Sequence, residues 1–147
     1  MRPALLRGHT KPITVVKFNF DGDLLFTGSG EKVVNLWYAN SGERIGSFEP
    51  KAAVRTLDVT NNSDILIVGT NVGTLEFFKI DGGQLLGHYS IDARFKTIQL
   101  SYGDKKLLAV RNDHQILNIK TLFSSSNGIT EKNPVLLNFS SSMLKLC

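Results

Sequence analysis

Apolar and polar residues alternate in short runs along much of the chain. Val16 and Phe18 flank a lysine, and Leu57 and Val59 flank an aspartate, which is the period-two pattern of a half-buried β-strand. Turn-forming triplets such as Asp21-Gly22-Asp23 separate the runs. No stretch shows the apolar spacing of an amphipathic helix. The pattern therefore predicts an all-β fold.

The runs recur at a fixed interval. When the sequence is shifted by 41 residues against itself, Gly28 falls on Gly69 and residues 42–48 fall on 83–89 without a gap. Each unit has four short strands, the content of one β-propeller blade. About three and a half blades fall below the usual minimum of about four for a closed ring, so we expect an incomplete or open propeller. The predicted single domain, 1–147, divides into blades at 8–48, 49–89 and 90–139 and the start of a further strand at 140–147.

The third unit fits the interval with a slip. We align it with one inserted residue, which places Leu107 and Leu108 beneath Ile65 and Leu66. A polar loop at 123–134 then precedes the last apolar run of the unit at 135–139. We expect that loop to be the most mobile part of the unit.

Composition and charge narrow the function classes. The one cysteine, Cys147, has no partner for a disulfide or a thiolate metal cage, and no apolar stretch approaches the roughly 18 residues of a membrane span. We therefore expect an intracellular, water-soluble protein. The formal net charge of +4 is mild, and the basic residues do not cluster as in a typical nucleic-acid-binding protein.

The first unit has the signature of a known repeat. Gly8-His9 precedes Leu36-Trp37-Tyr38 by the interval of a WD40 repeat. The whole opening string, with Met1 to His9, Lys17-Phe18-Asn19 and Val34 to Tyr38, resembles the WD40 family of subunit I of eukaryotic translation initiation factor 3. The likeness is close over residues 1–48, brief at 53–56 and weak beyond residue 90.

The resemblance implies a non-enzymatic WD40 scaffold in the cytoplasm. Such a protein would dock other subunits of translation initiation factor 3 and contact the small ribosomal subunit indirectly, with no cofactor, no membrane and no specific nucleic-acid sequence. The family has about seven blades, each with its own repeat. Here Glu49-Pro50-Lys51-Ala52 leads directly into a segment that resembles the family's following repeat, so one blade is absent. A fragment, a shortened gene product and a reduced protein completed by a partner all fit.

The resemblance also implies a structural network in the first unit. WD40 blades place a hydrogen-bonded set of four side chains at the positions of His9, Thr27, Glu31 and Trp37. Here Glu31 replaces the usual aspartate, and the extra methylene leads us to expect a looser or water-bridged network. Units two and three lack the set, with Phe78 and Lys120 at the position of Trp37 and Val72 at that of Glu31.

The sequence leaves three other functions to consider: catalysis, an adaptor role in another complex, and RNA binding. A catalytic role for His9 with Thr27 and Glu31 is disfavoured, since no second group of residues converges there to bind a substrate. His88 is predicted to be an ordinary strand residue and His114 a turn residue, and no metal site is expected. A WD40 adaptor of another cytoplasmic complex remains open. An RNA-binding module would use a basic rim formed by Arg44, Arg55, Arg94, Lys96, Lys105 and Lys106.

Overall fold

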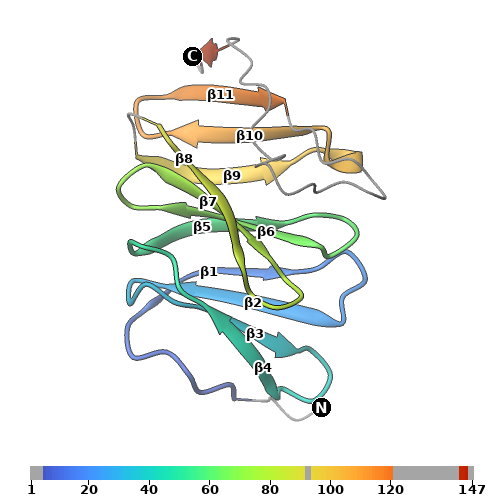
Figure 1. Ribbon diagram of the computed structural model, residues 1–147. Helices are drawn as coiled ribbons and strands as arrows, with labels where there is room; N and C mark the ends of the chain where they lie inside the picture. Colours follow the sequence, from blue (N-terminus) through green and yellow to red (C-terminus); the bar gives the residue numbers. More distant parts are fainter. Residues whose placement is uncertain (1–4, 92–93, 121–142, 146–147) are drawn as a thin grey trace.

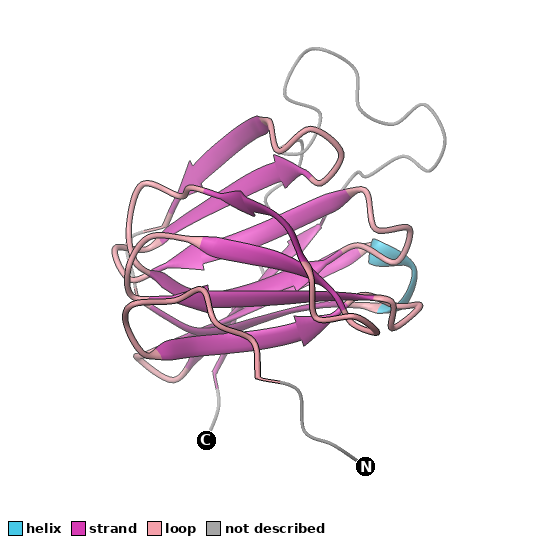
Figure 2. Cartoon of the chain, turned by 90° about the horizontal axis from the view of Figure 1, so that it is seen from below, coloured by secondary structure: helices cyan, strands magenta, loops and turns pink. Residues whose placement is uncertain are grey.

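The structure of the protein, a computed structural model, describes residues 5–91, 94–120 and 143–145. Within these ranges the chain forms twelve strands and one short helical turn. Figure 2 shows that strands dominate the structure. The predicted all-β fold class is therefore confirmed. None of the helical structure in the described ranges is long and apolar enough to cross a bilayer.

The strands form three antiparallel sheets of four strands each, stacked one after another (Figure 1). In each sheet, strands that are consecutive in the numbering are neighbours. The first sheet contains β1 (Ile13–Phe18), β2 (Leu24–Ser29), β3 (Val34–Tyr38) and β4 (Arg44–Phe48). The second contains β5 (Val54–Val59), β6 (Ile65–Thr70), β7 (Thr74–Lys79) and β8 (Leu85–Ser90). The third contains β9 (Phe95–Leu100), β10 (Lys106–Arg111), β11 (Gln115–Lys120) and β12 (Met143–Lys145), with the turn η1 (Tyr102–Asp104) between β9 and β10.

The first strands of the three sheets lie next to one another. β5 contacts both β1 and β9, whereas β4 and β8 are the outer strands of their sheets. Sheets joined at their first strands are the blades of a β-propeller.

The turns repeat with the same backbone conformation. Gly22, Ser63 and Asp104 lie 41 residues apart and have φ values of 78°, 59° and 58°. A left-handed conformation is costly for residues other than glycine, so the sheet geometry imposes this turn even where the sequence lacks glycine. A second turn recurs in the same way at Lys32, Gly73 and His114.

The interval of 41 holds through β11, and the inserted residue predicted in the third unit is wrong. Leu107 pairs with Leu100, as Leu66 pairs with Val59 in the second sheet. Leu107 therefore takes the position of Leu66 and is fully buried. The sequence was ambiguous here because Leu107 and Leu108 are identical neighbours, and a slip of one residue moves every side chain to the opposite face of a sheet.

The corrected register changes which residue replaces the tryptophan in the third sheet. Trp37 pairs with Leu25, and Phe78 pairs with Leu66 one interval later. In the third sheet Ile119 pairs with Leu107. Ile119, rather than Lys120, therefore stands at the position of Trp37.

The end of the described chain completes the third sheet. Met143–Lys145 pairs with β11, with Lys145 opposite Gln115. This pairing differs from the prediction that residues 140–147 open a further unit, because an opening strand would begin a new sheet. The predicted loop at 123–134 and the predicted strand at 135–139 lie outside the described residues.

Two apolar clusters fill the spaces between the sheets. The cluster between the first and second sheets includes Phe26, Val34 and Leu57. The cluster between the second and third sheets is also made of buried apolar side chains, such as Ile67 and Phe95. Gly28 permits the close packing of the first sheet against the second, because a Cβ at that position would lie 2.5 Å from Cγ1 of Val54. The buried members of the cluster between the first and second sheets are Phe26, Val34, Leu36, Phe48, Val54, Leu57, Val59, Leu66, Val68 and Phe78.

Hydrogen bonds also join the first strands across the sheets. The Thr14 hydroxyl donates to the carbonyl of Val54 at 2.8 Å, and the backbone N–H of Leu100 donates to Oδ2 of Asp58 at 2.7 Å. Asp58 also lies 3.7 Å from Nζ of Lys17. This buried carboxylate therefore ties the second sheet to both of its neighbours.

Candidate interaction site

The four side chains of the predicted network meet in the first sheet. Nε1 of Trp37 donates to Oγ1 of Thr27 at 2.9 Å, that hydroxyl lies 2.7 Å from Nε2 of His9, and Nδ1 of His9 lies 2.5 Å from Oε1 of Glu31. The indole can only donate. The Glu31 carboxylate can only accept, so Nδ1 of His9 donates to it. In the tautomer with its proton on Nδ1, Nε2 accepts from the Thr27 hydroxyl.

Glu31 is held by more donors than the sequence suggested. The backbone N–H of Thr10 donates to Oε2 at 2.9 Å, the Thr10 hydroxyl donates to the same oxygen, and the Ser29 hydroxyl donates to Oε1 at 2.9 Å. The two Thr10 bonds are the main cause that lowers the pKa of Glu31 to about 2, with His9 and Ser29 adding to the effect against the opposing effect of burial. The expected looser network is wrong: the longer side chain reaches His9 directly and Thr10 as well.

The network connects the segment before β1 to strands β2 and β3. The His9 side chain is only 5% exposed, and Thr27 is also buried. The Thr27 hydroxyl is already engaged by Trp37 and His9. Groups that satisfy one another in this way stabilise a fold, and we keep the structural role as our interpretation.

The corresponding places in the second sheet are built differently. Phe78 is buried and its ring centroid lies 5.7 Å from that of Phe48, so an apolar contact replaces the indole hydrogen bond. Val72, at the position of Glu31, is exposed. Pro50 stands one interval after His9 and is buried.

The outer face of β1 is apolar and uncovered. Val16 and Phe18 are 53% and 56% exposed, whereas Leu57 and Val59, one interval later, are 1% and 8% exposed. The equivalent residues of β9 are also buried. The same positions are thus covered by a neighbouring sheet in two cases and are open in the first. Contiguous exposed apolar surface marks an interaction site.

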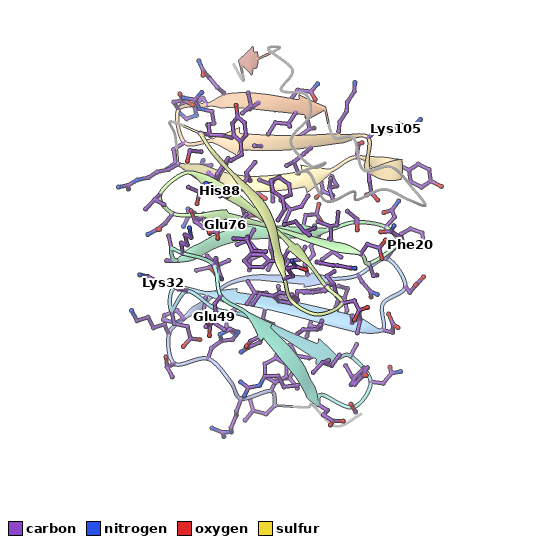
Figure 3. The ribbon with its side chains drawn as sticks, viewed as in Figure 1. Phe20, Lys32, Glu49, Glu76, His88 and Lys105 are labelled. Atoms are coloured by element: carbon purple, nitrogen blue, oxygen red, sulfur yellow. The ribbon has the colours of Figure 1, made fainter. Side chains whose placement is uncertain are left out.

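The structure does not gather the predicted basic rim into one patch. The Arg55 side chain turns to the third sheet, where Nε donates to the carbonyl of Phe95 at 3.3 Å. Figure 3 shows Lys105 at the opposite end of the strands from Lys32. The basic residues fall in three places: Arg44 at the start of β4, Arg55 with Arg94 and Lys96 near the starts of β5 and β9, and Lys105 with Lys106 at the start of β10.

The remaining histidines lie where the sequence placed them. His88 belongs to β8, and His114 lies in the turn before β11 with a positive φ. Over the ranges that the structure describes, no three His, Cys, Asp or Glu residues gather as a metal-binding group.

Two buried carboxylates were not predicted from the sequence. Asp58 and Glu76 are 4% and 2% exposed. Each interrupts an apolar strand, and Glu76 stands between Leu75 and Phe77. Carboxylates are almost never fully buried without partners, so an acidic residue at a predicted core position was the available signal.

Comparison with known proteins defines the class first. The family model "WD domain, G-beta repeat" matches residues 3–38. The fold is similar to that in the crystal structure of the RRP9 WD40 repeats, with a TM-score of 0.72 and 16% sequence identity. The matched region covers 78% of this chain and 37% of the RRP9 chain. The chain therefore has the fold of WD40 propeller blades.

Sequence relatives then define the family more narrowly. The chain is 33% identical over 114 residues to "Eukaryotic translation initiation factor 3 subunit I" of Schizosaccharomyces pombe, covering 77% of this chain and 35% of that protein. It is 39% identical over 110 residues to the protein of the same name from Dictyostelium discoideum, covering 75% of this chain and 33% of the relative. The predicted resemblance is confirmed: the chain is related to subunit I of translation initiation factor 3 and spans about a third of the length of these relatives.

Proposed function

We propose that the chain is a non-enzymatic scaffold of translation initiation. In this proposal it docks other subunits of translation initiation factor 3 while the initiation complex assembles on the small ribosomal subunit in the cytoplasm. Two findings support it: the relationship to subunit I and the rigid, internally hydrogen-bonded sheets of a WD40 fold.

The uncovered face of β1 is the observation on which the proposal depends. Its residues match positions that bury completely against a neighbouring sheet elsewhere in the same chain. A partner that covers Val16 and Phe18 would gain about 1.5–3 kcal/mol for each fully buried side chain. This gain is enough to contribute strongly to a specific protein contact.

A binding experiment with purified components tests this proposal. The tagged 147-residue chain is mixed with the other subunits of initiation factor 3 after nuclease treatment, and binding is measured by interferometry. We expect binding that survives moderate salt, and a loss of at least about tenfold in the Val16→Asp/Phe18→Asp variant. Tyr102→Asp is the matched control and should bind normally, because Tyr102 lies in the turn η1, far along the chain from β1, and is 91% exposed.

The alternatives give different results in the same assay. An RNA-binding module would lose its partner with nuclease or bind with a steep salt dependence. An adaptor of another complex would show no affinity for these subunits. If the wild-type chain binds none of them, or if the β1 variant binds as well as Tyr102→Asp, the proposal fails.

A further inference from the structure

Two pockets occupy equivalent places in the first and second sheets. Both lie beside the turn between the second and third strands, and four of their lining positions match at the interval of 41 residues. Their volumes are about 470 and 410 Å³. The shared positions are Glu31, Val33, Asn35 and Ser47 in the first pocket and Val72, Thr74, Glu76 and His88 in the second.

The second pocket has a buried carboxylate with few partners. Glu76 is 2% exposed. Among the residues that the structure describes, its oxygens accept the backbone N–H of Lys51, at 3.0 and 3.4 Å, and no other donor. Within the described ranges it makes no ion pair. An ionised carboxylate can accept about four hydrogen bonds, and burying one without a counter-charge is costly.

The contrast with the first sheet shows how unusual this carboxylate is. Glu31 accepts bonds from Thr10, Ser29 and His9, so its charge is well solvated by the protein. Asn35 lines the first pocket, and its buried Oδ1 has no hydrogen-bond partner within the described part of the chain. Both pockets therefore present acceptors that need donors.

The walls of the second pocket suit a long side chain with a charged end. Ala52, Ala53 and Val72 supply apolar surface. His88 lies directly opposite Glu76 on the neighbouring strand, and Figure 3 shows both on the second sheet with Lys32 on the adjoining first sheet. Lys32 also lines the pocket and is exposed. The pocket thus pairs the carboxyl group of Glu76 with a basic residue from the first sheet.

We propose that this pocket binds an arginine side chain of a partner protein, in a segment with acidic residues beside that arginine. The guanidinium would donate to Glu76, where its planar fork matches a carboxylate. The aliphatic part would lie against Ala52, Ala53 and Val72. Acidic neighbours in the same segment would meet Lys32 and Lys51, which line the same pocket. The inference rests on the proposed function only in taking the ligand to be part of a docked protein.

The test is a peptide titration of the isotope-labelled 147-residue chain, in which the backbone amide signals are monitored by NMR. The probe is the peptide acetyl-Glu-Arg-Glu-amide, and its control has citrulline, the neutral isostere of arginine, at the central position. We expect the Lys51 amide signal to shift and saturate with the arginine peptide, and affinity for the citrulline peptide to be at least about tenfold lower.

Two variants locate the effect. Glu76→Gln should lower the affinity for the arginine peptide at least about tenfold, and an unchanged indole signal of Trp37 shows that the fold is intact. Asp81→Asn removes an exposed carboxylate from the turn after β7 and should bind like wild type. Equal binding of both peptides, unaltered binding by Glu76→Gln, or no binding of the arginine peptide overturns the inference.

The result is independent of the subunit-binding experiment. The Val16→Asp/Phe18→Asp variant changes β1 and leaves the pocket residues unaltered, so it should bind the arginine peptide normally. If the peptide fails to bind while the wild-type chain still binds initiation-factor subunits, the arginine pocket is wrong and the scaffold proposal stands. If the peptide binds and the subunits do not, the arginine pocket stands and the scaffold proposal is wrong.

Discussion

Replacing Trp37 tests whether the hydrogen-bonded network stabilises the first sheet. Trp37 is 3% exposed and donates to Thr27 at 2.9 Å. Truncation to alanine removes nearly the whole buried ring, which costs about 3–5 kcal/mol. Trp37→Phe keeps most of the ring and removes the N–H donor, so it should cost about 1–2 kcal/mol for the lost bond to a buried hydroxyl. Phe78 at the equivalent position of the second sheet shows that phenylalanine fits this fold.

Urea unfolding followed by far-UV circular dichroism measures these costs. Fluorescence is unsuitable, because Trp37 is the one tryptophan of the chain. Tyr38→Ala is the control: Tyr38 is next in the same strand but 48% exposed, and its loss should cost less than half of that of Trp37→Ala. Equal costs for the two alanine variants, or a cost below about 1 kcal/mol for Trp37→Ala, would refute the network as a stabilising element.

Three further predictions concern charge and packing. The pKa of Glu31 is lowered to about 2 by Thr10 first and by His9 and Ser29 after it, so the stability that ionised Glu31 contributes is complete above its ordinary value of 4.5 and is lost as the pH falls toward 2. The difference in urea midpoint between wild type and Glu31→Gln should therefore be largest at neutral pH and shrink on acidification; a constant difference contradicts this. Gly28→Ala should destabilise by about 1–3 kcal/mol because its Cβ meets the second sheet, whereas Gly46→Ala, with open space around it, should be nearly neutral; similar urea midpoints would contradict this. Asp58→Ala removes the acceptor of the Leu100 N–H and should cost about 1.5–3 kcal/mol, with faster hydrogen exchange at Leu100 as the local signature, and unchanged exchange there would argue against it.

The repeat interval and the alternation predicted most of the fold, because both depend on local chemistry. Val16 and Phe18 revealed a strand, and a shift of 41 residues revealed the sheets. The register of the third sheet needed the pairing itself, since Leu107 and Leu108 satisfy either alternative. The pairing of Met143–Lys145 with β11 also depends on a contact between segments remote in the sequence.

The network and the pocket show different limits of sequence analysis. The network was predictable because its four residue types stand at fixed positions of a known repeat. The direct contact of Glu31 with His9 was not, because it depends on where the backbone of Thr10 lies. Glu76 went unnoticed because no motif includes it, although a charge between Leu75 and Phe77 already conflicted with the burial expected at that position.

The loss of the network in the second sheet and the presence of Glu76 are connected. In the first sheet, Glu31 accepts the backbone N–H of Thr10. One interval later that N–H belongs to Lys51, and Val72 at the position of Glu31 has no acceptor to offer it. Glu76, four residues further along in β7, accepts it instead. The second sheet thus keeps a carboxylate for the same backbone group while lacking the histidine and serine donors that surround Glu31. What remains is a buried carboxyl group with fewer donors and a pocket beside it, which is why a ligand with its own donors is expected there.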